Sequence, residues 1–119
     1  MRKSWILIAL AWASIAPAKE SIRADGRELR SSCMEAVDSV DRGTPLTFRG
    51  GVCAGYLHGL RDMLDSQAGV CVPTAATAEQ LIRVYVLWAD RHPERLHEDE
   101  MDVAVASLKE AFPCRSPKR

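Results

Sequence analysis

Four cysteines are the residues of this 119-residue chain whose spacing says most about their chemistry. They stand at positions 33, 53, 71 and 114, so no two of them are close neighbours in the sequence. An even number of cysteines in a short exported chain is typical of a disulfide framework. We therefore predict two structural disulfides from Cys33, Cys53, Cys71 and Cys114, and the count alone leaves three pairings open.

The same spacing argues against other uses of cysteine. A structural zinc site commonly takes two ligands from one C-x-x-C loop, and a thioredoxin-type redox centre uses the same close pair. No C-x-x-C occurs in the sequence. Cysteines that are bridged to one another cannot act as nucleophiles either. We expect no metal ion and no cofactor.

The three histidines lack the neighbours that acid–base catalysis would require. The sequence has no G-x-S-x-G elbow, no phosphate-binding glycine loop before a lysine, and no H-E-x-x-H helix. His58 falls in a predicted helix and is expected to be an ordinary, partly exposed side chain. His92 and His97 flank a segment that is either a helix–helix turn with capping side chains or a loop that contacts another protein. We predict no catalytic residues and no enzymatic activity.

Composition narrows the class of protein further. Sixteen basic residues balance sixteen acidic ones, so the chain lacks the positive excess of a nucleic-acid-binding protein. Apolar residues make up 47% and charged residues 27%, as in a folded soluble domain. Aromatic residues make up only 6%, which favours a helical core over a β-sandwich.

Residues 1–18 have the three parts of a secretory signal peptide. They begin with two basic residues, continue with an apolar run over 5–15, and end on the small-residue site Ala16-Pro17-Ala18, with Ala13 as the reserve cleavage site. A transmembrane anchor would need about 20 apolar residues. We therefore expect export to an oxidising compartment, most simply the bacterial periplasm, with no membrane attachment after cleavage. Residues 19–119 would then form a single helical domain.

Four helices and no strand are predicted for this domain. Cap signals mark the first helix, which Asp25 begins and Gly43 ends, and the third, which has a Thr77/Gln80 capping box. Pro93 ends the third helix and fits the first turn of the fourth, whose early part is acidic. The predicted helices follow one another along the chain from Asp25 to Gly43, Phe48 to Asp65, Thr77 to Pro93, and Pro93 to Phe112.

Three glycines are unusual for a helix interior. Gly51, Gly55 and Gly59 fall at i, i+4 and i+8 of the second helix and leave one stripe without side chains. Each costs about 1 kcal/mol against alanine in helix propensity. We predict that a neighbouring helix packs closely against this stripe, and the alternative is that the glycines mark a loop.

Short connections between the helices favour two antiparallel pairs. Cys33 then lies shortly before the first turn and Cys53 shortly after it, at similar heights. This layout favours a Cys33–Cys53 disulfide. Cys71, in the loop Gln67–Thr74, remains to pair with Cys114 at the end of the fourth helix. The predicted fold is an all-α, disulfide-stapled bundle of about four helices.

Four motifs occur in a fixed order along the domain. They are Cys53-Ala54-Gly55-Tyr56-Leu57-His58-Gly59-Leu60-Arg61-Asp62, Cys71-Val72-Pro73, Trp88-Ala89-Asp90-Arg91-His92-Pro93-Glu94-Arg95-Leu96-His97 and Ala111-Phe112-Pro113-Cys114. Taken together, they resemble the Rap/Tai family of type VI secretion amidase immunity proteins over Leu29 to Cys114. The resemblance implies an exported, all-helical, disulfide-bonded protein that binds a peptidoglycan amidase and blocks its active-site cleft, often as a dimer.

Two functional hypotheses follow. The first is a periplasmic immunity protein that inhibits such an amidase, with the Gln67–Thr74 loop as a second candidate contact. The acidic run Glu98 to Asp102 is either a solvated helix start or a contact for a basic partner. The second hypothesis is a periplasmic acid-stress holdase chaperone, which would expose apolar surface at low pH. The candidate partner-binding residues of the first hypothesis are His92, Glu94, Arg95 and His97.

Overall fold

The computed structural model of the chain describes residues 24–64 and 66–115, and the signal peptide predicted for 1–18 lies outside them. The described residues form an all-α fold with no strand, as predicted. Its α-helices are α1 (Gly26–Arg42), α2 (Phe48–Met63), α3 (Ala78–Arg91) and α4 (Glu100–Ala111), with short 3-10 turns η1 (Ser66–Ala68) and η2 (Pro93–Arg95).

Local cap signals place the ends of α1 and α3 where they were predicted. The Asp25 side chain accepts hydrogen bonds from the backbone amides that begin α1, and Gly43 closes that helix with φ 66°. At α3, the Thr77 side chain accepts from the amide of Gln80 while the Gln80 side chain accepts from the amide of Thr77. These capping bonds confirm the predicted start of α3.

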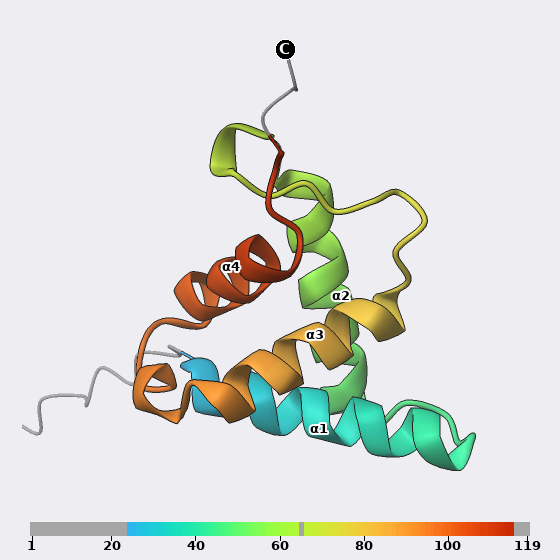
Figure 1. Cartoon of the computed structure of the whole chain (residues 1–119). Coiled ribbons are helices and arrows are strands. Elements are labelled where there is room, and N and C mark those ends of the chain that lie inside the picture. The colour runs from blue at the N-terminus through green and yellow to red at the C-terminus, as the bar shows by residue number, and fades with distance from the viewer. Residues whose placement is uncertain (1–23, 65, 116–119) are drawn as a thin grey trace, which may run out of the picture.

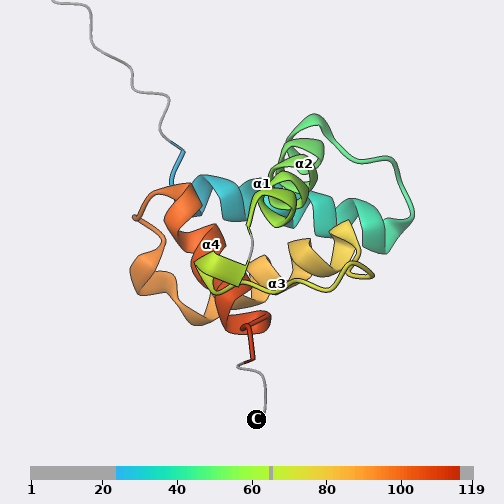
Figure 2. The ribbon, with the colours of Figure 1, turned by 90° about the horizontal axis from the view of Figure 1, so that it is seen from above.

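The helices are arranged differently from the predicted pairs. Figure 1 shows α1 and α3 side by side and antiparallel, while α2 crosses them steeply; Figure 2 looks nearly along α2. The predicted antiparallel pairing of α1 with α2 is therefore wrong. The crossing is possible because Gly50, which has no side chain, lies against the backbone of Ala36 in α1.

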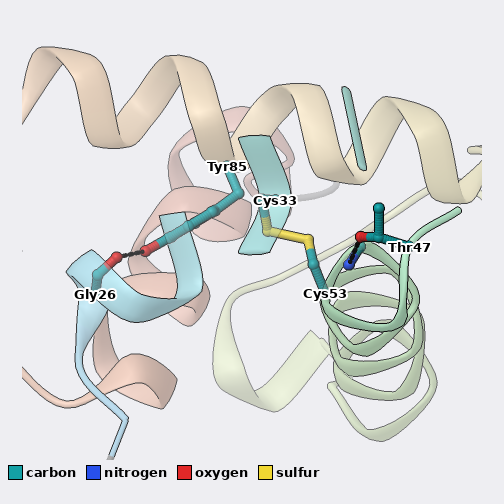
Figure 3. Close-up of a disulfide and its surroundings, with 6 residues drawn as sticks. Gly26, Cys33, Thr47, Cys53 and Tyr85 are labelled. Carbon is teal, nitrogen blue, oxygen red and sulfur yellow. Dashed lines mark hydrogen bonds between the residues drawn. A yellow bond between two sulfur atoms is a disulfide. The ribbon is translucent and has the colours of Figure 1, made fainter. Parts of the chain in front are cut away.

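The core lies between α1, α2 and α3, and α4 closes it over α3. Tyr85 is fully buried, and its hydroxyl donates to the carbonyl oxygen of Gly26 at 2.8 Å (Figure 3). This bond satisfies a polar group inside an apolar core and ties α3 to the start of α1. The other large apolar side chains that are fully buried are Leu57, Val70, Leu81, Val103 and Leu108.

Both predicted disulfides are confirmed. Cys33 and Cys53 are bonded inside the core, with their Cα atoms 5.2 Å apart (Figure 3). Cys71 is bonded to Cys114, with a Cα separation of 5.0 Å. The first bridge joins α1 to α2, and the second joins the loop after α2 to the end of α4. All four cysteines are used.

The prediction for the glycine stripe of α2 is wrong. A Cβ added at Gly51, Gly55 or Gly59 would meet nothing within 4 Å, so no neighbouring helix packs against them. The close approach falls one residue earlier, at the buried Gly50. The face of α2 that carries Gly50 and Cys53 turns inward, and the stripe therefore lies on the outer face.

The fourth helix begins later than predicted. Pro93 opens the separate turn η2, and α4 starts at Glu100 with Asp99 as its N-cap. The chain between them is held in another conformation because the carbonyl oxygens of Leu96 and Glu98 accept hydrogen bonds from the first amides of α1. A contact distant in sequence thus interrupts the helix that the local pattern favoured.

Candidate functional site

The predicted contact turn, residues 92–97, joins α3 to α4. Its backbone is fixed against the start of α1, since the amides of Gly26 and Arg27 donate to the carbonyl oxygens of Glu98 and Leu96, each at 3.1 Å. A Cβ on Gly26 would lie 3.1 Å from the Cα and the carbonyl oxygen of Leu96. Glycine at this position therefore allows the turn to approach α1 closely.

Trp88, near the end of α3, supports the side chains of the turn. The indole is almost fully buried, and its Nε1 donates to Oε2 of Glu110 in α4 at 2.9 Å. The His92 ring lies 4.6 Å from the indole, centroid to centroid, and Cζ of Arg95 lies 5.2 Å from the indole centroid. Aromatic and cation–π contacts of this kind restrict both side chains to one side of the turn.

Three carboxylates complete the charge pattern. Arg95 donates to both carboxylate oxygens of Glu98 at 2.9 Å, and this hydrogen bonding lowers the pKa of Glu98. His92 lies between Glu94, at 3.3 Å from Nδ1, and Glu110, at 3.5 Å from Nε2. The pKa of Glu94 is also lowered, first by a hydrogen bond from its own backbone amide and further by His92. The turn thus carries oriented charges of both signs.

The structure brings together three of the four predicted contact residues. His92 and Arg95 lie on Trp88 and Glu94 contacts His92, whereas His97 lines a hollow of about 200 Å³ with Ala24, Asp25 and Asp99. Sequence reasoning missed two residues of this group. Trp88 appeared only within a family motif and was given no role of its own, and Glu110 is 22 positions away from Trp88, so no local pattern connects them.

The second predicted contact, the loop 67–74, is tied to the end of α4. Besides the Cys71–Cys114 disulfide, the amide of Cys71 donates to the carbonyl oxygen of Phe112 at 2.8 Å. Figure 1 places this loop well away from η2. A hollow of about 180 Å³ adjoins it and is lined by Arg61, Asp62, Val72 and Thr74.

The charges at the acidic start of α4 act on Tyr56 in α2. The Tyr56 hydroxyl is buried and has no hydrogen-bond partner among the described residues. Burial, and then the charges of Glu100, Asp99 and Asp102, raise its pKa to about 12. Burial also raises the pKa of Glu100, with Asp99 and Glu28 as further causes. This phenol stays protonated at neutral pH, which does not suit a general base.

The described residues offer no group of three or more His, Cys, Asp or Glu side chains that could hold a metal ion. His58 lies on the exposed side of α2 beside Arg61, whose Nη2 is 2.8 Å from the His58 Nε2, and beside Asp62. Within the part of the chain that the structure describes, none of the helices is long and apolar enough to cross a bilayer.

The chain matches the model of a known protein family. The family model of the Rap1a immunity proteins matches residues 25–114. That range begins at the N-cap of α1 and ends at Cys114, so it includes all four α-helices and both disulfides. No curated protein and no solved structure matches the chain.

Proposed function

Because the chain belongs to the Rap1a family of immunity proteins, we propose that it binds and inhibits a peptidoglycan amidase effector of type VI secretion in the periplasm. Membership implies an immunity protein against a bacterial effector, which acts by binding rather than by catalysis. Two disulfides are consistent with an oxidising compartment. We propose that residues 1–18 direct export and that residues 19–119 are the inhibitory domain.

The rigid turn 92–97 is the observation that supports a contact role most directly. Its backbone is bonded to α1, and Trp88 holds the side chains of His92 and Arg95 in place. A contact surface that is ordered before binding loses less side-chain entropy in the complex. Arginine is also enriched among the residues that dominate binding energies. We propose that this turn meets the effector and covers its active-site cleft.

The outer face of α2 favours a homodimer as part of the same proposal. Phe48 and Met63 are 87% and 76% exposed, and Val52 is half exposed. In an antiparallel contact between two copies of α2, Phe48 would face the partner's Met63 and Val52 would face the partner's Gly59. A two-fold interface requires this kind of self-complementary pattern.

Co-production in the periplasm tests the inhibitory function. The full chain should prevent lysis by one amidase among candidates encoded by neighbouring genes. The double variant His92→Ala/Arg95→Ala should lose that protection, while the control His58→Ala, on the exposed side of α2, should keep it. Failure of the unaltered protein to bind or protect against every candidate would contradict the proposed function.

Sedimentation equilibrium tests the dimer. The unaltered protein should show a concentration-dependent dimer, and Phe48→Glu should be a monomer at the same concentrations because a charge would be buried in the contact. Met101→Glu, at a half-exposed apolar position of α4, is the matched control and should still dimerise. A monomeric unaltered protein would refute this part of the proposal.

A further inference from the structure

A hollow of about 280 Å³ opens on the surface between α1 and α3. We infer that it receives a large apolar side chain of the effector, so that the contact surface extends from the turn 92–97 along α3. This inference rests on the proposed function and adds the chemistry of the segment that binds. The hollow is lined by Met34, Val37, Arg83, Val86, Leu87 and Asp90.

The floor of the hollow is apolar, and its rim is accessible. Val86 is buried, and Val37 packs against the core. Met34 and Leu87 are 41% and 59% exposed, which leaves two large apolar side chains in water. Apolar surface around a concave site is typical of a place where a partner inserts a side chain.

Leu87 joins this hollow to the turn. It also lines a second hollow, of about 220 Å³, between α3 and α4, together with Trp88 and Glu110. Those two residues support His92 and Arg95. The α1–α3 hollow, the exposed Leu87 and the turn therefore form one continuous surface along α3, which a single partner can cover.

Ion pairs between α1 and α3 stand at both ends of the α1–α3 hollow. At one end Arg30 donates to Oδ1 of Asp90, with Nη2 at 2.7 Å and Nε at 2.9 Å. At the other end Nη2 of Arg83 lies 2.6 Å from Oδ1 of Asp41. Both pairs join α1 to α3, so they help to fix the width of the hollow before a partner arrives.

The charges at the two ends indicate the chemistry of the occupant. Arg83 also pairs with Glu79 of its own helix, with Nη2 3.1 Å from Oε1. The side chains of Arg83 and Asp90 are still 40% and 46% exposed, so each can accept a further partner of opposite charge. They are seven residues apart on α3, or about 10 Å along the helix axis. The segment that fits carries one or two large apolar side chains between an acidic and a basic residue, as on one face of an amphipathic helix.

A peptide titration tests this chemistry without the effector. The probe is a stapled helical peptide about three turns long, with Glu, Leu, Leu and Arg at i, i+3, i+4 and i+7 of one face. Methyl NMR of the full mature chain should show shifts at Met34, Val37, Val86 and Leu87. Control peptides with both leucines changed to serine, or with two acidic flanks, should bind at least about tenfold more weakly. Equal binding of the controls, shifts confined to α2, or no shifts would overturn the inference.

Substitution of Leu87 provides the second test. Leu87→Glu should fold, because the side chain is exposed. It should weaken the binding of both the peptide and the neutralised amidase by about tenfold or more. Leu46→Glu is the matched control, since Leu46 is an exposed leucine at 45% in the loop before α2. Circular dichroism and thermal unfolding verify that both variants are folded.

The outcomes separate this inference from the proposed function. If Leu87→Glu binds the amidase as tightly as Leu46→Glu does, the hollow is not part of the interface with the amidase, although the immunity function stands. If the unaltered protein neutralises no candidate amidase, the proposed function fails, and the peptide titration still decides whether the hollow binds such a segment. If Leu87→Glu instead dissociates a dimer in sedimentation equilibrium, a second copy fills the hollow and the inference is wrong.

Discussion

Gly50 lies directly against Ala36 at the crossing of α1 and α2. A Cβ added at Gly50 would stand 3.1 Å from both the Cα and the amide nitrogen of Ala36. These are backbone atoms of a helix, so they cannot yield as the end of a flexible side chain can. The nearby Cys33–Cys53 disulfide holds the same two helices together.

We therefore expect Gly50→Ala to lower the free energy of unfolding by about 1–3 kcal/mol, the usual cost of overpacking. Gly51→Ala is the matched control, because a Cβ there meets nothing within 4 Å. It should raise the free energy of unfolding by up to about 1 kcal/mol through helix propensity. Urea unfolding of both variants measures these values, and equal effects would show that the crossing is not close.

Removing either disulfide should destabilise the fold. The loss should be larger for the disulfide that closes the longer loop. The sequence separations of 20 and 43 correspond to loop-closure terms of about 3 and about 4 kcal/mol. Guanidinium unfolding of Cys33→Ala/Cys53→Ala and of Cys71→Ala/Cys114→Ala compares the two. A loss below about 1 kcal/mol in both double variants would contradict the bracing role of the bridges.

Much of the fold follows from local signals. The caps at Asp25, Gly43 and Thr77 depend on residues close to them in the sequence, so the ends of α1 and α3 were predictable. The disulfide pairing was also correct, although the antiparallel layout behind it was not. Cys33 and Cys53 come together at the crossing instead, where Gly50 admits α2. Which helix face turns inward depends on the whole fold, and the glycine stripe was misassigned for that reason.

The candidate site was only partly predictable. The turn was located from His92 and His97 on either side of a proline segment, but its support comes from Glu110 and from the start of α1. Such contacts leave no spacing pattern, since the residues are far apart in sequence. The hollow beside Leu87 was missed because an apolar residue on α3 gives no sign of whether it is buried.

Glu100 should give a pH-dependent stability effect. Burial, with Asp99 and Glu28, raises its pKa in the folded state above the unfolded value, so the protonated form favours folding. Protonated Glu100 makes its full contribution to stability below about pH 4.5. This contribution is lost as the pH rises through the pKa of Glu100 in the folded state. Glu100→Gln should therefore raise the melting temperature at pH 7 and have little effect at pH 4. The opposite pH dependence would contradict the assigned cause.

Trp88→Phe should loosen the turn. The variant loses the bond from Nε1 to Glu110, and a hydrogen bond to a charged group contributes about 1.5–3 kcal/mol. Hydrogen exchange should become faster in the turn 92–97, while the amides of α2 should change little. Glu110→Gln keeps an acceptor for the indole and should have the smaller effect. Unchanged exchange in Trp88→Phe would show that the indole does not support the turn.

Dye binding separates the immunity protein from the holdase chaperone. A holdase exposes apolar surface and protects unfolded clients only as the pH falls. We expect the binding of an apolar dye to the disulfide-bonded protein to stay nearly constant between about pH 7 and pH 4, with no client protection. A steep rise in dye binding together with client protection over this range would favour the chaperone.

Inhibition of a purified amidase tests the central claim most directly. Peptidoglycan cleavage by a candidate amidase is followed while the oxidised mature protein is added in increasing amounts. We predict that cleavage falls to zero at equimolar protein, and that His92→Ala/Arg95→Ala requires a large excess. Full cleavage by every candidate amidase in the presence of excess folded protein would contradict the claim that this chain is an amidase inhibitor.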